Sequence, residues 1–135
     1  MGFDQYHEPP AELPPATRTF ARMCASLTEE AEAIGWYEQR LAVESDPEAA
    51  AIMRDAQGEE FKHFSMDLEF LLRQTPAWRE IAQGVLFQPG DIVEKGEEAE
   101  AAAAGGDGPS ASAAPAGGPV GSGSLGIGSL RGTER

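Results

Sequence analysis

Three side chains of the kind that bind transition metals occur at helical spacing in this sequence: Glu30, Glu60 and His63. Glu60 and His63 are three residues apart, so they share one face of a helix. Glu30 lies within a row of otherwise apolar residues, in the order Phe20, Met23, Leu27, Glu30, Ile34, Tyr37 and Leu41. A charged group on such a core face is costly unless it is paired or bound to a metal. The spacing therefore predicts a metal site.

Two long helices and one short helix must position these side chains. The row that contains Glu30 recurs at alternating intervals of three and four, which is typical of an amphipathic helix, and Pro14-Pro15 can begin it. Asp46-Pro47 supplies an N-cap and a proline at the first helical position, so a second helix is expected from there to about Gln74. Thr75-Pro76 repeats this pattern and predicts a short third helix that ends near Gly84.

The short connection between the long helices predicts an antiparallel hairpin in an all-α protein. Glu30 and Glu60 are about equally distant from the turn, so they should lie level with one another. A two-helix hairpin leaves one side of each helix open, and a folded part of about 80 residues is small for an independent core. We therefore expect two hairpins to dimerise into a four-helix bundle.

This ligand set has a known chemical use. Di-iron carboxylate bundles take one glutamate from each of two helices and a Glu-x-x-His pair from each of the other two. One hairpin supplies half of that set, and two copies of Glu30, Glu60 and His63 would complete it. These donors suit iron, manganese or zinc, so the residues alone do not select the metal. The alternative is that Glu60 and His63 form a solvated surface pair, but a level Glu30 on the facing helix favours metal.

The overall charge of the protein disfavours some classes of binding partner and favours others. The 135 residues include ten Lys and Arg against 23 Asp and Glu, a net charge of −13. This charge disfavours nucleic-acid binding and suits cations. No apolar run is long enough for a membrane span and no signal pattern opens the chain, so we expect a cytoplasmic protein without membrane association. The single Cys24 excludes an internal disulfide and a cysteine-rich zinc site, and His7 is assigned no role.

The composition changes along the chain. Every aromatic residue lies at or before Phe87, whereas alanine, glycine, serine and proline dominate the end of the sequence. Such a segment cannot bury enough apolar surface to fold. We predict a flexible N-terminus over 1–12, a folded domain over 13–93, a disordered linker over 94–123 and a separate terminal segment over 124–135.

Two segments carry a family resemblance: TEEAEAIGWYEQR over 28–40 and DAQGEEFKHFSMDLEFL over 55–71. They resemble encapsulated ferritins, the ferritin-like ferroxidases housed in encapsulin nanocompartments. The resemblance implies that Glu30, Glu60 and His63 bind two irons between two chains, oxidise Fe(II) to Fe(III), and deliver it for mineral storage inside the shell. It also implies homodimers that assemble into an annular decamer. The alternative is a non-catalytic metal-binding or scaffolding bundle carried as encapsulin cargo.

The resemblance suggests further roles around the iron ligands. Glu29 and Glu32 would attract or bind metal on its approach, although a solvated acidic face is the simpler alternative. Trp36 and Tyr37 would lie beside the ligands, where the Tyr37 hydroxyl could hydrogen-bond one of them; the alternative is that both rings only pack. Calcium is a candidate ion for secondary carboxylate sites.

The chain ends in GSLGIGSLRGTER, where isolated apolar side chains stand among small residues. This segment resembles the cargo-loading peptides that dock on the inner wall of an encapsulin shell. Glycine and serine would let the backbone lie flat in a groove while the larger side chains fill pockets. The resemblance assigns encapsulin binding to Leu125, Ile127, Leu130 and Arg131.

Overall fold

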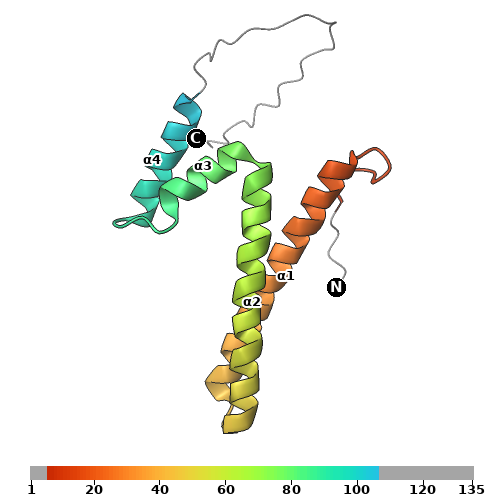
Figure 1. The fold of residues 1–135 in the computed structure, drawn as a ribbon, viewed down its shortest axis with the longest axis vertical. Coiled ribbons are helices and arrows are strands. Elements are labelled where there is room, and N and C mark those ends of the chain that lie inside the picture. The colour runs from red at the N-terminus through yellow and green to blue at the C-terminus, as the bar shows by residue number, and fades with distance from the viewer. Residues whose placement is uncertain (1–5, 107–135) are drawn as a thin grey trace, which may run out of the picture.

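The computed structural model describes residues 6–106, and this part of the chain is helical without strands (Figure 1). Its helices are α1 (Pro15–Val43), α2 (Pro47–Gln74), α3 (Pro76–Val85) and α4 (Ile92–Gly105). The all-α prediction and the first three helices are confirmed. No helix in this range is long and apolar enough to cross a membrane. Leu125, Ile127, Leu130 and Arg131 lie outside the described residues.

The helices begin where the sequence predicts. Pro15, Pro47 and Pro76 occupy first-turn positions, where the missing N–H of proline would have no helical partner in any case. The Asp46 side chain caps α2 by accepting a hydrogen bond of 2.8 Å from the backbone N–H of Ala49. These boundaries fix the lengths of both long helices and thus the positions of Glu30, Glu60 and His63 along the helix axes.

α1 and α2 form the predicted antiparallel hairpin (Figure 1). Buried Ala25 and Ala50 are small enough to let the helices approach one another. Gln57 is also buried, and its Nε2 donates to the carbonyl oxygen of Ile34 at 3.3 Å and to Oε2 of Glu38 at 3.0 Å. Because an unpaired buried amide would be costly, these bonds fix the axial alignment of the two helices.

The hairpin keeps an open apolar face. Leu71 is the one fully buried large side chain in the described residues. By contrast, Ile52, Met66 and Phe70 are 66%, 62% and 36% exposed, and helical periodicity puts them on one side of α2. We call these three residues the open face. A hairpin with so small a core leaves apolar surface available to another element.

The fourth helix differs from the prediction. A disordered linker was expected from residue 94, whereas α4 covers Ile92–Gly105. The Asp91 side chain caps it by accepting a hydrogen bond of 2.9 Å from the backbone N–H of Glu94. Alanine and glutamate favour helix, and Ala99 is buried against Gly84 of α3. The prediction of disorder is therefore wrong for 94–105, because it counted bulky apolar residues and overlooked the cap and the alanines.

α3 and α4 pack on one another at the end of α2, as Figure 1 shows. Within the described residues, α1 contacts only α2, and the α3–α4 pair contacts the hairpin through α2. At this junction Glu69 of α2 accepts hydrogen bonds from Arg73 Nε at 2.8 Å and from Arg79 Nη1 at 3.0 Å. The pair is thus attached to the hairpin by a small contact and one shared carboxylate.

Candidate metal centre

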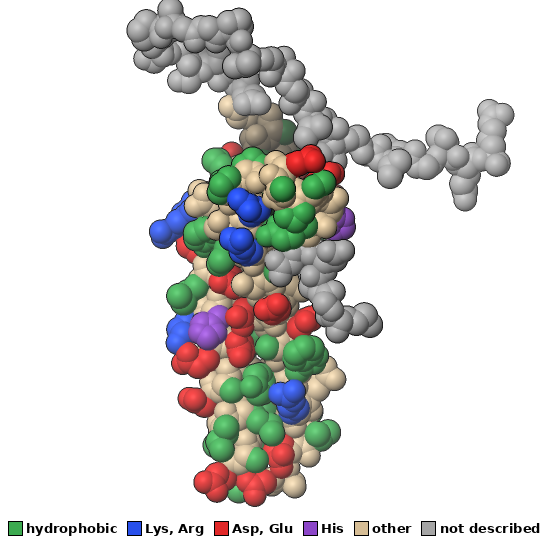
Figure 2. All heavy atoms as spheres, turned by 90° about the vertical axis from the view of Figure 1, so that its right-hand side faces the viewer, with side chains coloured by type: hydrophobic (Ala, Val, Ile, Leu, Met, Phe, Trp, Pro, Cys, Tyr) green, Lys and Arg blue, Asp and Glu red, His purple; other side chains and the backbone are tan. Residues whose placement is uncertain are grey.

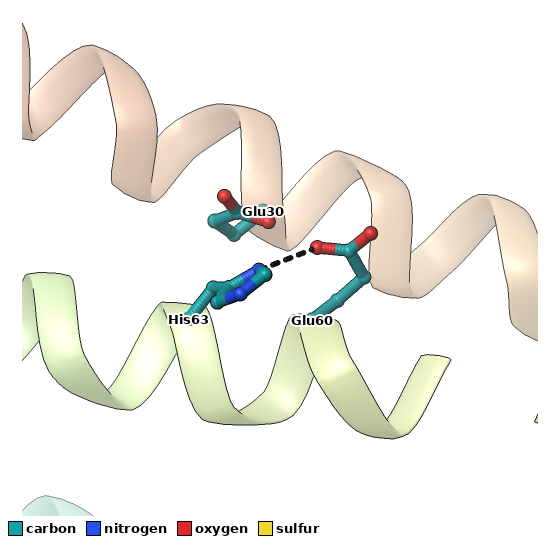
Figure 3. A group of neighbouring side chains, drawn as sticks. All are labelled: Glu30, Glu60 and His63. Atoms are coloured by element: carbon teal, nitrogen blue, oxygen red, sulfur yellow. Dashed lines mark hydrogen bonds and ion pairs between the residues drawn. The ribbon is translucent and has the colours of Figure 1, made fainter. Parts of the chain in front are cut away.

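Glu30, Glu60 and His63 converge between the two long helices. Glu30 comes from α1, and Glu60 and His63 come from α2 (Figure 3). Each residue offers one potential ligand atom, and these atoms all lie within 4.8 Å of one another. Nδ1 of His63 lies 3.4 Å from Oε2 of Glu60. Two carboxylates and an imidazole at this spacing form a donor set that suits iron, manganese or zinc.

The local sequence explains the convergence. The three-residue interval brings Glu60 and His63 onto one side of α2. Gln57 lies one turn before Glu60 and bonds to the carbonyl of Ile34, which lies one turn after Glu30. This hydrogen bond of Gln57 therefore holds the turns that carry Glu30 and Glu60 at the same height, in agreement with the predicted antiparallel hairpin.

The electrostatics of the cluster favour a bound cation. A hydrogen bond with Glu60, followed by desolvation and by the negative charge of Glu60, raises the pKa of Glu30. The same hydrogen bond, with help from His63, lowers the pKa of Glu60. Charging both carboxylates at this close range therefore costs free energy. A bound metal ion would compensate both negative charges.

The cluster is open on one side. The His63 side chain is 46% exposed and that of Glu60 is 22% exposed. Figure 2 shows acidic side chains gathered midway along the hairpin next to a histidine, with hydrophobic side chains above and below. Helical periodicity puts His63 beside the open face of Ile52, Met66 and Phe70. The arrangement resembles half of a site whose other half would come from a covering element.

The remaining predicted site residues lie outside this group of three. Glu29 and Glu32 are exposed on α1. Trp36 is 53% exposed, and the guanidinium of Arg40 lies 5.2 Å from the centre of the Tyr37 ring. Their roles in metal approach and beside the ligands therefore stay predictions, and the contact of Tyr37 with Arg40 is a cation–π interaction.

Asp67 belongs to the site's surroundings and was missed by the sequence analysis. It lies four residues after His63 and seven after Glu60, which puts all three on one side of α2. Its negative charge contributes to the raised pKa of Glu30. The i, i+3, i+7 spacing of Glu60, His63 and Asp67 was visible in the sequence and could have identified it.

Known proteins are similar to this chain in sequence. The EncFtn-like family model matches residues 5–89. The "Ferritin-like protein" of Thermotoga maritima is 42% identical over 95 residues, which cover 70% of this chain and 83% of that protein. The "Encapsulated ferritin-like protein" of Rhodospirillum rubrum is 40% identical over 126 residues, which cover 93% of this chain and 87% of that protein.

A solved structure agrees with these matches. The crystal structure of protein ne0167 from Nitrosomonas europaea is similar with a TM-score of 0.64 and 38% sequence identity, over 66% of this chain and 98% of that chain. The family match spans α1, α2 and α3 and includes the three converging side chains. With its helical hairpin, its carboxylate and histidine cluster and these relatives, the chain belongs to the EncFtn-like family, the encapsulated ferritins.

Proposed function

We propose that this protein is a ferroxidase whose di-iron site forms between two copies of the chain. The observation that carries the proposal is the convergence of Glu30, Glu60 and His63 within 4.8 Å. This set is half of the ligands that di-iron carboxylate bundles use, and a two-fold dimer would supply the other half. The exposed His63 beside the open face supports the same pairing, because a second hairpin would cover both.

The reaction uses iron as its substrate. Two Fe(II) ions each lose one electron to one O₂ molecule, which takes up two protons and leaves as hydrogen peroxide, and two Fe(III) ions result. The glutamate oxygens favour this direction, because hard anionic donors bind Fe(III) more tightly than Fe(II). Glu60 raises the pKa of Glu30, and a bound cation would favour the ionised form of both carboxylates.

The family membership supports a place for the protein inside a shell. The Rhodospirillum rubrum relative is named an encapsulated ferritin-like protein. We propose that dimers assemble into an annular decamer, that residues 124–135 bind an encapsulin shell protein in the cytoplasm, and that the shell stores the mineral. Residues 107–123 would connect α4 to this peptide, and a tether raises the effective concentration of every further tail once one has bound.

The oxidation experiment tests the catalytic claim. Anaerobic protein receives Fe(II) and then air, and the absorbance of ferric species is followed in wild type, Glu30→Ala and Glu80→Ala. Glu80 is an exposed glutamate of α3 and serves as the control. We expect wild type and Glu80→Ala to oxidise iron much faster than buffer and Glu30→Ala to approach buffer. Metal binding without turnover in wild type would instead support a non-catalytic bundle.

Two measurements test the assembly. Gel filtration with and without iron should show larger species when iron is present, because a shared site links metal binding to association. An unchanged elution profile would argue against a site between chains. Deletion of 124–135 should leave oxidation intact and prevent co-purification with a co-expressed shell, whereas unchanged co-purification would refute the loading peptide.

A further inference from the structure

Asp67 is a charged residue on the inner side of α2 that the proposed ligand set does not use. It is half-buried, whereas its apolar neighbour Met66 is 62% exposed. None of the ion pairs within residues 6–106 includes it. A half-buried carboxylate without a basic partner in this range can act on a positive charge that lies nearby.

The helix geometry indicates where that charge would be. Asp67 follows His63 by one turn and Glu60 by two, so its side chain, which leans toward the N-terminal end of the helix, is directed back toward His63. Asp67 also acts electrostatically on Glu30 of the facing helix. It is not among the three residues whose ligand atoms lie within 4.8 Å of one another, so we do not assign it as a ligand.

The charges of the site change with this residue. Two copies of Glu30 and Glu60 carry four negative charges when ionised, which balance the positive charge of two divalent ions. Two copies of Asp67 raise the total to six negative charges, which balance two trivalent ions. A fixed negative charge near a metal stabilises a trivalent ion more than a divalent ion at the same place, in proportion to the ionic charge.

We propose that Asp67 is a specificity-determining residue that makes the metal centre prefer trivalent over divalent cations. This inference rests on the proposed metal site and adds which charge state of the ion the site favours. It assigns Asp67 an effect through space, without direct coordination. In the iron reaction, the same charge would favour the Fe(III) product over the Fe(II) substrate.

Binding of two redox-inactive probes tests the proposal without turnover. Calorimetry under one buffer condition compares Tb³⁺ and Co²⁺ binding to wild type, Asp67→Asn, Asp67→Glu and Asp55→Asn. Asp55 is an exposed aspartate of α2 about three turns from Asp67, so it controls for the loss of one charge on the same helix. Circular dichroism confirms that each variant is helical.

We expect Asp67→Asn to lower the affinity for Tb³⁺ about tenfold more than the affinity for Co²⁺. Asp67→Glu should keep the wild-type ratio of the two affinities, and Asp55→Asn should keep it as well. Equal losses for both ions, or none, would overturn the role of Asp67 while the metal site stands. If wild type binds neither ion, the metal site itself is refuted and the role of Asp67 with it.

Discussion

The α1–α2 hairpin and the α3–α4 pair are built on opposite packing strategies. The hairpin joins two long helices, buries one large side chain completely, and keeps carboxylates and a histidine between its helices. The α3–α4 pair is short and packs through small residues. A Cβ atom added at Gly84 would lie 2.5 Å from Cβ of Ala99, so the two backbones approach as closely as their side chains permit.

The difference shows what each region can tolerate. The hairpin leaves the His63 side chain 46% exposed beside an open apolar face, so a metal or a covering partner could reach it. The α3–α4 contact has no room for a methyl group at Gly84, and the pair is attached to α2 by a limited contact at Glu69. We therefore expect changes in the hairpin to alter metal binding and changes in the pair to alter local stability.

The largest expected effect is the loss of a ligand. His63→Ala should lower Co²⁺ affinity by more than about a hundredfold, because it removes the only nitrogen donor of the cluster. Calorimetry gives the affinity, and hydrogen exchange should show that α3 and α4 keep their protection. His7→Ala removes the only other histidine and should change neither quantity. Equal losses in both variants would contradict the assigned site.

Gly84→Ala should destabilise α4 and leave metal binding unchanged, which is the opposite of what we expect for His63→Ala. The new methyl group meets Ala99, and overpacking of this kind costs about 1–3 kcal/mol. Hydrogen exchange should increase in α4 while Co²⁺ affinity stays at the wild-type value. The double variant Gly84→Ala with Ala99→Gly returns the space and should recover most of the protection. Loss of metal binding in Gly84→Ala would show that the two regions are coupled.

Gly58→Ala also replaces a glycine by an alanine, but it lies in the hairpin and should stabilise the protein instead of destabilising it. A Cβ atom at Gly58 meets nothing within 4 Å, and this position lies inside α2. Alanine restricts the unfolded chain more than glycine does, so the free energy of unfolding should rise by about 0.5–1 kcal/mol. Urea denaturation measures the change. A decrease would indicate that another chain packs closely against this turn.

The smallest expected effect concerns the junction between the regions. Hydrogen bonds from Arg73 and Arg79 lower the pKa of Glu69. Its folded pKa is therefore below the unfolded value of about 4.3, so its contribution to stability is present above that pH and is lost as the pH falls through the folded pKa. Hydrogen exchange of α3 in wild type and Glu69→Gln should differ near neutral pH and converge in acid. A difference that persists in acid would contradict this origin.

Much of the hairpin was predictable because its signals are local. Prolines mark three helix starts, and the interval between Glu60 and His63 needs only helical periodicity. The level position of Glu30 followed from the short turn at Asp46. The convergence of the three side chains therefore follows from local signals in the sequence.

The unpredicted parts depend on an overlooked local signal and on tertiary contacts. The Asp91 cap of α4 is a local signal that the sequence carries, whereas the partner that Ala99 finds in Gly84 does not follow from composition. The bonds of Gln57 across the hairpin are equally invisible in a sequence where glutamine usually lies at the surface. Asp67 was overlooked because a single aspartate near a Glu-x-x-His pair is common on helices.

The alanine-rich sequence of α4 has a consequence for helix register. Ala99 and Ala103 are one turn apart, so either would present a methyl group of the same size to Gly84, and the contact alone does not distinguish them. The distinction comes from the turn, where Phe87 and Gly90 adopt positive φ of 62° and 101° and Asp91 caps the helix at a fixed distance. Residues 86–91 therefore determine which alanine of α4 lies opposite Gly84. An insertion there would allow α4 to shift by one turn and bring Ala103 opposite Gly84 in place of Ala99.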